Sequence, residues 1–569
     1  MITKKCLWIL VAILFAILPA NAQYDIVPMP QNIELQKGEP FTLWNDLVQI
    51  VAPENLDAEA TFLQAYLKDV TGATLPIVQK RMKGMSCIEL SVSPKIVDYE
   101  GYVLTINKKG ITIAGGSAAG VFYGIQTLRK AIVNARQSQH VTELTNKPSA
   151  SSAAPPFTLL NPVVITDAPR FSWRGMHLDC SRHFFPVAFV KKFIDLLALH
   201  NMNVFHWHLT DDQGWRLEIK KWPKLTTIGS QRSGTIIGTN SDIDDGIPYG
   251  GYYTQAEARE IVSYAAARHI TIVPEIDMPG HMLAALASYP ELGCTGGPYQ
   301  VGHYWGVYKD VLCVSNPRTY EFVQDVLTEV MDIFPSEVIH IGGDETPTDN
   351  WQTCPKCQTL NATFGTADAQ SEAFSPLTSK LSSLQAHFTK RVFDFLTSKG
   401  RRALGWDEIL DGAPQDAMIM SWRGSAPGAK AAEAGHDVVM TPTTHCYFDY
   451  QQVKNTEFEP SRCGGFIPIE KVYSLDPAPD SLSVKARSHI LGTQANLWSE
   501  YMTNEQMVEY QALPRMSALA EVQWTQPERK NYQAFLQRLT LFSSLFERYH
   551  YTYAKHLWPE RQIPNRWQF

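Results

Sequence analysis

From about residue 169 onward, short apolar segments alternate with longer segments whose apolar residues recur every three or four positions. Short apolar runs are typical of buried parallel strands, and the longer segments are typical of amphipathic helices that connect them. We expect helices at Phe189–His200, Gln255–Arg268 and Ser383–Ser398, and eight strands at Gly175–Asp179, Asn203–His208, Thr271–Ile276, Val338–Ile341, Arg402–Gly405, Met418–Ser421, Asp437–Met440 and Ile490–Gln494. Eight β/α units predict a (β/α)8 TIM barrel, an α/β fold.

The segment from about residue 24 to 134 has a different pattern. Apolar residues in Glu59–Val70 and Ala118–Lys130 have helical spacing. Tyr102–Ile106 and Ile111–Ala114 alternate as strands do, around a turn that ends in glycine. This mixture predicts a small α+β accessory domain ahead of the barrel, and none of its residues forms a group typical of catalysis.

The domain boundaries follow from changes in composition. Ser138–Pro156 is rich in Ser, Ala, Thr and Pro, which predicts a linker, and Thr158–Thr166 is a candidate strand of either domain. We therefore expect four segments: a signal peptide at 1–22, the accessory domain with its linker at 23–157, the catalytic barrel at 158–545, and a C-terminal extension at 546–569 that packs on the barrel.

The N-terminus has the pattern of a secretory signal peptide. Lys4 and Lys5 precede the apolar run Leu7–Leu18, and Ala20-Asn21-Ala22 forms a cleavage sequence before Gln23. The alternative is an uncleaved anchor, although the run is short for a membrane span. We expect a periplasmic or secreted protein with no stable membrane insertion after cleavage.

Composition narrows the function classes. The net charge of −7 gives no basic surface of the kind that binds nucleic acid. Aromatic residues make up 11% of the chain, with 14 Trp. Such residues are as typical of sugar-binding clefts as of ordinary cores, so composition alone does not decide between the two.

The cysteines suggest local disulfides. Loss of Cys6 with the signal peptide leaves eight of the nine cysteines, and export permits disulfides. We favour Cys294–Cys313 and Cys354–Cys357 as bridges. A redox or zinc role of the C-x-x-C pair is the alternative, but no second C-x-x-C or H-x-x-x-H accompanies it. Cys87, Cys180, Cys446 and Cys463 are expected to be buried or unpaired. We expect no metal and no cofactor.

Polar and aromatic side chains follow nearly every predicted strand. In a TIM barrel the C-terminal strand ends form the active site, so these side chains are expected to converge. They are Arg182 after the first strand, Asp211 and Asp212 after the second, Asp277 and His281 after the third, Asp344 and Glu345 after the fourth, Trp406, Asp407 and Glu408 after the fifth, Trp422 after the sixth, Tyr447 and Asp449 after the seventh, and Trp498 and Glu500 after the eighth.

Carboxylates beside tryptophans fit glycoside hydrolysis, which needs one protonated acid and a second negative group near the anomeric carbon. Asp344 and Glu345 are adjacent after a pair of glycines, Gly342 and Gly343. We expect an ionised Asp344 to raise the pKa of Glu345 toward that of a general acid. The glycines are expected to permit unusual dihedral angles and the approach of a sugar to the backbone.

The run His340-Ile341-Gly342-Gly343-Asp344-Glu345 closely resembles the signature of glycoside hydrolase family 20, the β-N-acetylhexosaminidases. The similarity continues in order from Arg174-Gly175 to Trp498-Ser499-Glu500, and the preceding segment resembles the family's accessory domain. The resemblance implies exo-acting, retaining removal of terminal β-linked GlcNAc or GalNAc from a glycan, in which the substrate's own 2-acetamido group attacks to give an oxazolinium intermediate.

The resemblance also implies roles for individual residues. Glu345 matches the general acid/base and Asp344 the residue that orients the acetamido group, with Tyr447 donating to its oxygen. Asp211 and His281 match a buried relay to Glu345. The remaining matches bind the sugar: Trp406, Trp422 and Trp498 as walls, and Arg182, Asp449 and Glu500 as partners of the hydroxyl groups.

Each assignment has a simpler alternative. His206 and His208 could be metal ligands, and Arg182 could only pair with Asp179 or Asp212. Trp422 and Trp498 could be core residues. The sequence does not separate Asp211 from Asp212 and gives Asp407 and Glu408 no firm role. The loop with Asp242, Asp244 and Asp245 could bind calcium, although a solvated loop is favoured.

Two other functions fit less well. A zinc amidohydrolase-like barrel would require the histidines to bind metal, and a non-catalytic glycan-binding barrel would be expected to lack some of the matched positions. The sequence leaves open the natural glycan, the preference between GlcNAc and GalNAc, and the oligomeric state.

Overall fold

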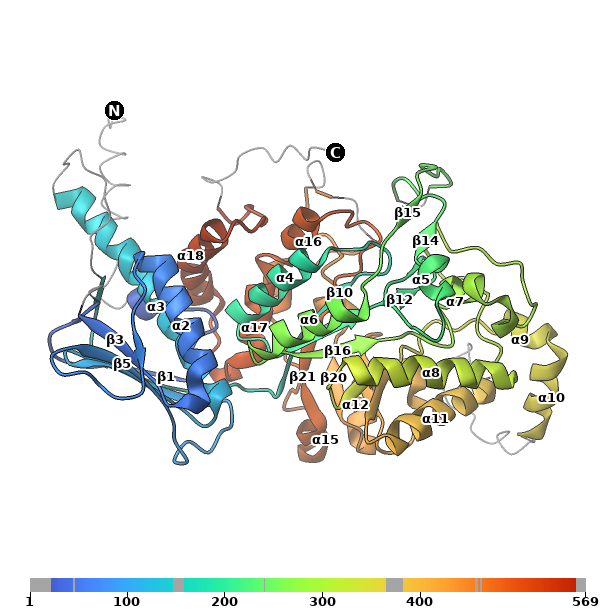
Figure 1. Ribbon diagram of the computed structural model, residues 1–569, viewed down its shortest axis with the longest axis horizontal. Helices are drawn as coiled ribbons and strands as arrows, with labels where there is room; N and C mark the ends of the chain where they lie inside the picture. Colours follow the sequence, from blue (N-terminus) through green and yellow to red (C-terminus); the bar gives the residue numbers. More distant parts are fainter. Residues whose placement is uncertain are drawn as a thin grey trace. The chain divides into compact units, whose positions relative to one another are not determined.

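The computed structural model describes residues 22–43, 47–146, 158–239, 241–364, 382–455, 459–460 and 463–558 (Figure 1). Contacts between residues divide the chain into two units. The first comprises residues up to Arg170 together with Ala198–Asn201 and Ala520–Tyr551, and the second comprises the rest. Among the described residues, no helix is long and apolar enough to cross a membrane.

The first unit is built on a seven-stranded sheet. Its strands lie in the order β1 (Asn32–Leu35), β9 (Val163–Asp167), β6 (Tyr102–Asn107), β7 (Gly110–Gly115), β5 (Ser86–Val92), β3 (Val48–Val51) and β4 (Ile77–Val78). Helices α2 (Asp57–Thr71), α3 (Ala118–Asn146) and α18 (Tyr532–Arg548) belong to the same unit. The mixture of α-helices and β-strands confirms the predicted α+β domain.

Two local features differ from the expectations. Helix α3 continues past Lys130 into the expected linker and ends at Asn146, because Ala131, Ile132 and Ala135 extend its buried face. Strand β9 pairs antiparallel with β1 and β6, so this segment belongs to the first unit. The boundary between the two units therefore lies after Arg170, and not before Thr158 as expected. Residues 147–157, which include most of the expected linker, lie outside the described residues.

The second unit is a closed barrel of eight parallel strands, which confirms the predicted fold. In order around the barrel the strands are β10 (Trp173–Asp179), β11 (Val204–His208), β16 (Thr271–Glu275), β17 (Val338–His340), β18 (Arg402–Trp406), β19 (Met418–Ser421), β20 (Val438–Met440) and β21 (Ile490–Ala495). Nearly all their residues are buried, since helices cover the outer faces of parallel strands. This burial explains the continuous apolar runs in the sequence.

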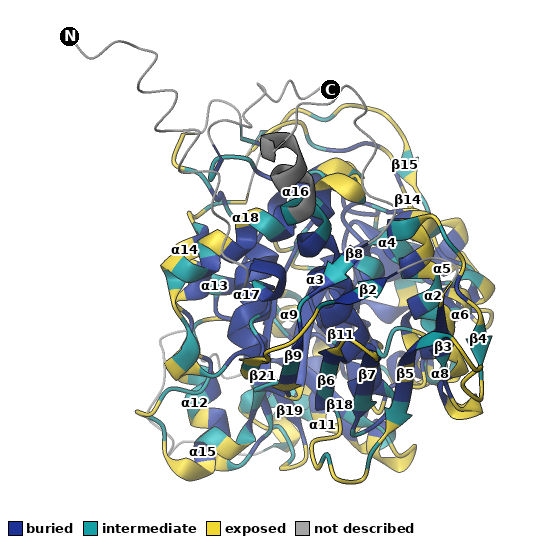
Figure 2. Cartoon of the chain, turned by 90° about the vertical axis from the view of Figure 1, so that its left-hand side faces the viewer, coloured by how far each residue is buried: buried dark blue, intermediate teal, exposed yellow. Residues whose placement is uncertain are grey.

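Helices follow the strands as expected, and the sequence accounts for where several begin. They include α4 (Val187–Leu199), α6 (Gln255–Ala266), α8 (Pro317–Ile333), α11 (Ser382–Ser398), α12 (Ser425–Ala434), α15 (Val484–His489), α16 (Glu505–Ala512) and α17 (Arg515–Trp524). Thr254 and Glu257 form a capping box at α6, and Asn316 caps α8 before Pro317. Figure 2 shows exposed residues concentrated in loops and on helices such as α12 and α15.

The interior of the barrel has an apolar layer and a polar layer. Trp173, Val204, Val273, Leu404, Met418, Met420 and Val439 pack together as one buried apolar cluster. Nearer the C-terminal strand ends, His206, His208 and His340 surround the buried carboxylate of Glu275. The polar layer thus lies beneath the strand ends where the predicted site residues are found.

The expected C-terminal extension divides between the two units: residues up to Tyr551 belong to the first, and those from Thr552 belong to the second. The backbone N–H of Thr552 donates to Glu509, and that of Ala554 donates to the carbonyl of Leu513. The last part of the expected extension, residues 559–569, lies outside the described residues.

Candidate active site

The turn after β17 positions the two central carboxylates. Gly342 and Gly343 have φ values of 68° and 95°, and Glu345 has a φ of 42°. A Cβ atom at Gly342 would lie 1.7 Å from Asp277 Oδ1, and one at Gly343 would lie 2.4 Å from Ile409 Cγ2. The glycines therefore permit the expected dihedral angles, but the space they leave is occupied by Asp277 and Ile409 and not by a sugar.

Asp344 and Glu345 have different surroundings. The Asp344 side chain is 13% exposed and the Glu345 side chain 43%. The Nε2 atom of His281 lies 3.8 Å from Asp344 Oδ2 and 3.6 Å from Glu345 Oε2. The Oδ1 atom of Asp344 is buried and has no hydrogen-bond partner among the described residues.

The pKa values of the pair are the reverse of what the sequence suggested. Burial raises the pKa of Asp344 to about 6, against the effect of the His281 charge. The contact with His281 lowers the pKa of Glu345. The expectation of a raised pKa for Glu345 is therefore wrong, because Glu345 is the more exposed carboxylate and lies beside an imidazolium.

A chain of buried groups leads from the barrel interior to Glu345. His208 Nδ1 lies 2.7 Å from Glu275 Oε2, and its Nε2 lies 2.9 Å from Asp211 Oδ2. His281 Nδ1 lies 3.2 Å from Asp211 Oδ1. Burial alone would lower the pKa of His281, but the Asp211 charge and the polar contacts with Asp211 raise it well above its usual range. The structure thus brings the predicted Asp211–His281 pair together and extends it to Glu275.

Asp212 contacts the same ring as Asp211. Its Oδ2 atom lies 3.1 Å from His281 Nδ1, and its Oδ1 atom accepts from the backbone N–H of Leu283 at 3.0 Å. Asp211 differs in also accepting from His208 and pairing with Arg182. Both carboxylates can therefore hold the imidazolium, and only Asp211 connects it to the rest of the network.

Arg182, Asp449 and Glu500 form the polar part of the site. Arg182 is buried, with Nη2 2.8 Å from Asp211 Oδ2 and Nη1 3.3 Å from Asp179 Oδ2. Burial raises the pKa of Asp449 well above its usual range and also raises that of Glu500. Asp449 Oδ1 and Glu500 Oε2 are buried without a partner among the described residues. These oxygens are acceptors for which a ligand hydroxyl would supply the missing donor.

Aromatic rings form two pairs beside these groups. The ring centroids of Trp406 and Trp498 lie 5.7 Å apart, and those of Trp422 and Tyr447 lie 6.2 Å apart with nearly parallel planes. Burial, together with the charges of Asp449 and Asp344, raises the pKa of Tyr447 well above its usual range, so its hydroxyl remains a donor. Trp422 and Trp498 are partly exposed, whereas Trp406 is buried and donates from Nε1 to Glu275 Oε1 at 2.9 Å.

Asp407 and Glu408, which the sequence left without a role, hold Trp422. Glu408 Oε2 accepts from Trp422 Nε1 at 2.9 Å, and Asp407 Oδ2 accepts from the backbone N–H of Trp422 at 2.9 Å. Burial raises the pKa of Glu408 to about 8, and the charges of Asp344 and Asp407 add to this effect. The sequence signal that pointed to Asp407 and Glu408 as site residues was their position directly after Trp406 at a strand end.

Asp277 was expected at the site without a role, and Glu275 is a site residue that sequence reasoning did not single out. Asp277 Oδ1 accepts from the backbone N–H of Gly343 at 3.1 Å, and burial with the nearby Asp344 charge raises the pKa of Asp277 well above its usual range. Glu275 is the common partner of His206, His208 and His340. Glu275 ends strand β16 and Asp277 follows it, but only the closed barrel shows what they contact.

The two possible metal sites named from the sequence, the barrel histidines and the Asp242–Asp245 loop, contain side chains that contact other protein groups. His206 Nε2 lies 2.9 Å from Glu275 Oε2, so this histidine takes part in the polar layer, where burial lowers its pKa to about 4. In the loop expected as solvated, Asp244 Oδ2 lies 2.5 Å from His303 Nδ1, and Asp245 Oδ1 accepts from the backbone N–H of Thr235. These contacts connect the two carboxylates of the loop to His303 and Thr235.

Comparisons with known proteins agree with this geometry. The family model "Glycosyl hydrolase family 20, catalytic domain" matches residues 171–527, and "Glycosyl hydrolase family 20, domain 2" matches residues 23–145. A β-hexosaminidase of Porphyromonas gingivalis is 38% identical over 519 residues, which cover 90% of this chain. The chain spans only 62% of the length of that relative.

Solved structures extend the similarity to three dimensions. The β-N-acetylhexosaminidase of Streptomyces coelicolor A3(2) is 31% identical with a TM-score of 0.76, over 95% of this chain and 99% of that one. An exo β-N-acetylglucosaminidase of Vibrio harveyi, solved with N-acetylglucosamine, is 31% identical with a TM-score of 0.79, over 94% of this chain and 79% of that one. The chain therefore belongs to glycosyl hydrolase family 20 and is a glycoside hydrolase.

Proposed function

We propose that this protein is an exo-acting, retaining β-N-acetylhexosaminidase that removes terminal β-linked GlcNAc or GalNAc from glycans. The unequal setting of the adjacent carboxylates Asp344 and Glu345 is the observation that carries this proposal. The Asp344 side chain is 13% exposed and has a buried oxygen without a partner among the described residues, whereas the Glu345 side chain is 43% exposed beside the His281 ring. The names of the relatives, all β-hexosaminidases or acetylglucosaminidases, support the same activity.

The two carboxylates take different parts in the reaction. Glu345 gives its proton to the glycosidic oxygen, and the acetamido oxygen of the substrate attacks the anomeric carbon. The bond from this carbon to the glycosidic oxygen breaks, the aglycone leaves as an alcohol, and an oxazolinium ion forms. Asp344 accepts from the acetamido N–H and stabilises the positive charge that develops there. Glu345 then takes a proton from a water molecule. This water attacks the anomeric carbon and opens the oxazolinium ring, with net retention of configuration. A substrate nucleophile replaces the second protein carboxylate used by most retaining glycosidases.

The surrounding residues bind the sugar and tune the proton affinity of Glu345. His281, held by Asp211, keeps a positive charge beside Glu345 and favours its carboxylate form after proton transfer. The oxygens of Asp449 and Glu500 accept from sugar hydroxyls, to which Arg182 donates. Trp406, Trp422 and Trp498 enclose the acetamido group and the sugar face, and the Tyr447 hydroxyl donates to the acetamido oxygen.

The strength of the acetamido nucleophile tests this proposal. Aryl glycosides carrying zero, one, two or three fluorine atoms on the acetyl methyl group should show a progressive fall in kcat/KM, because each fluorine weakens the carbonyl oxygen as a nucleophile. The matching 2-hydroxy glucoside should be inert, and proton NMR should show the β-anomer as the first product. A kcat/KM that does not change along the series would rule out participation of the acetamido group.

We further propose that the protein is exported, with cleavage before Gln23. The proposal rests on the cleavage sequence Ala20-Asn21-Ala22, and in the described structure the Gln23 side chain forms hydrogen bonds with the backbone of Leu159 and Asn161. N-terminal sequencing of protein recovered outside the cytoplasm should therefore find Gln23 first. Recovery of only the full-length chain, retained with membranes, would favour the uncleaved anchor instead.

A further inference from the structure

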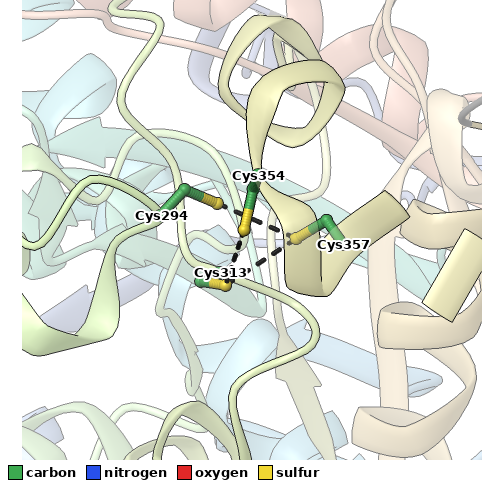
Figure 3. A group of neighbouring side chains, drawn as sticks. All are labelled: Cys294, Cys313, Cys354 and Cys357. Carbon is green, nitrogen blue, oxygen red and sulfur yellow. Dashed lines mark hydrogen bonds between the residues drawn. The ribbon is translucent and has the colours of Figure 1, made fainter. Parts of the chain in front are cut away.

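Four cysteines that are far apart in the sequence lie together in the second unit (Figure 3). Cys294 follows the short helix η3 (Pro290–Leu292), and Cys313 precedes helix α8. Cys354 caps helix α10 (Pro355–Thr363), and Cys357 lies in its first turn. Their ligand atoms are all within 4.8 Å of one another, and three of the four residues are buried.

The distances between the sulfurs exclude the disulfides expected from the sequence in this arrangement. The Sγ atom of Cys357 lies 3.8 Å from that of Cys294 and 3.7 Å from that of Cys313, and Cys313 lies 4.0 Å from Cys354. All four cysteines are free, whereas a disulfide bond is about 2.05 Å long. The shortest contacts also join different residues from the predicted pairs Cys294–Cys313 and Cys354–Cys357.

The same distances fit a tetrahedral metal site. Zinc–sulfur bonds of about 2.3 Å at tetrahedral angles place the sulfurs about 3.8 Å apart. This separation matches the observed contacts of 3.7, 3.8 and 4.0 Å. Four thiolates without an oxygen or imidazole ligand form the ligand set that favours zinc, and they leave no open position for catalysis.

The surroundings suit thiolates. Ser315 Oγ lies 3.4 Å from Cys313 Sγ and 3.3 Å from Cys357 Sγ, and the Ser315 backbone also hydrogen-bonds to Cys313. The single hydroxyl proton of Ser315 can be donated to one of these sulfurs, and a hydrogen bond of this kind orients and stabilises a metal-bound thiolate. Cys354 and Cys357 stand at the N-terminus of α10, where the helix dipole favours negative charge.

We propose that Cys294, Cys313, Cys354 and Cys357 bind one structural Zn²⁺ ion. The ion would join two loops of the active-site face, since Cys294 and Cys313 lie in the loop after β16, which carries His281, and Cys354 and Cys357 lie in the segment after β17, which carries Glu345. The Trp351 Nε1–Leu312 carbonyl bond of 3.0 Å already links these segments. The site thus goes beyond the proposed glycosidase chemistry, because it stabilises the scaffold of the catalytic groups without touching substrate.

Metal analysis of the full chain, expressed without a histidine tag, tests the site directly. Elemental analysis should find about one zinc per chain. Alkylation of the denatured protein after chelation should modify all four cysteines, and a mercurial reagent added to the native protein should release the zinc to a chromogenic chelator. Metal-free protein whose peptides are joined by disulfides, for example Cys294–Cys357 and Cys313–Cys354, would overturn the proposal.

A matched pair of variants locates the metal. Cys357→Ser should lose the bound zinc and melt at a lower temperature than the parent, whereas Cys87→Ser, at a buried cysteine of the first unit, should retain one zinc. If Cys357→Ser does not fold, wild-type protein grown with Co²⁺ should show the thiolate-to-cobalt charge-transfer and visible bands of a tetrahedral sulfur site. Equal zinc in both variants, or cobalt bound without those bands, would disprove the assignment.

Discussion

Replacement of Glu345 by Gln is expected to lower kcat/KM on an N-acetylglucosaminide with a poor leaving group by about 10²–10⁴-fold, the usual contribution of general acid catalysis. A dinitrophenyl leaving group departs without protonation, so the first step should be nearly unaffected with that substrate. Azide attacks without a general base and should therefore speed the second step and give a β-glycosyl azide. Unchanged turnover of the poor substrate would disprove the role of Glu345.

The pH dependence of the Glu345→Gln variant provides a second, independent readout. In the proposed mechanism the productive pair has Glu345 protonated and Asp344 ionised, while the pKa is about 6 for Asp344 and lowered for Glu345. The singly protonated pair is therefore the active form, and kcat/KM should fall as the pH rises above about 6, when the second proton leaves. In Glu345→Gln the charge of Glu345, which helps to raise the pKa of Asp344, is absent, so the residual activity should instead rise with pH as Asp344 ionises, at or below about pH 6.

A control at a surface glutamate separates this effect from a general change in charge. Glu321 lies on α8 with a side chain that is 61% exposed, in an ion pair with Arg318. Glu321→Gln should retain both the activity and the pH profile of the wild type. If this variant lost activity to the same extent, the loss in Glu345→Gln could not be assigned to the role of Glu345 as general acid.

Asp344→Asn should lower kcat by about 10²–10³-fold, because it removes the charge that stabilises the developing oxazolinium ion. Binding of N-acetylglucosamine should change much less, since the Asn oxygen still accepts from the acetamido N–H and the other contacts with the sugar remain. Calorimetric titration with the sugar and steady-state kinetics would separate the two effects. A parallel loss of binding and turnover would instead indicate a role in ground-state binding.

The same variant is expected to be more stable than the wild type above about pH 6. The pKa of Asp344 is raised to about 6 in the folded protein, so folding favours the protonated form. The stability of the wild type is therefore lost as the pH rises from the pKa of Asp344 in the unfolded chain through about 6. Asn cannot ionise and avoids this loss. The increase in melting temperature over the wild type should therefore be larger at pH 8 than at pH 4. A variant that is less stable at both pH values would show that the Asp344 carboxylate supports the fold.

Much of the barrel could be predicted because its signals are local. All eight strands begin and end within two residues of the expected positions, since strands buried on both faces must be short and apolar. The polar and aromatic residues after each strand were also recognisable, because parallel strands place their C-terminal ends on one face. Recognition of the family added the roles of Asp344 and Glu345, which a neighbouring pair of carboxylates does not define by itself.

The features that the sequence did not reveal depend on partners that are distant along the chain. The amino-acid sequence by itself determined the barrel strands, their order and the set of candidate site residues. Only the tertiary structure decided that the His281 contact lowers the pKa of Glu345, that β9 belongs to the first unit, and that Cys294 and Cys313 meet Cys354 and Cys357. The physical reason is that all three depend on distances and burial in the folded chain: the pKa shifts, the pairing of strands and the clustering of the four cysteine sulfurs. The spacing of residues along the sequence does not encode these distances.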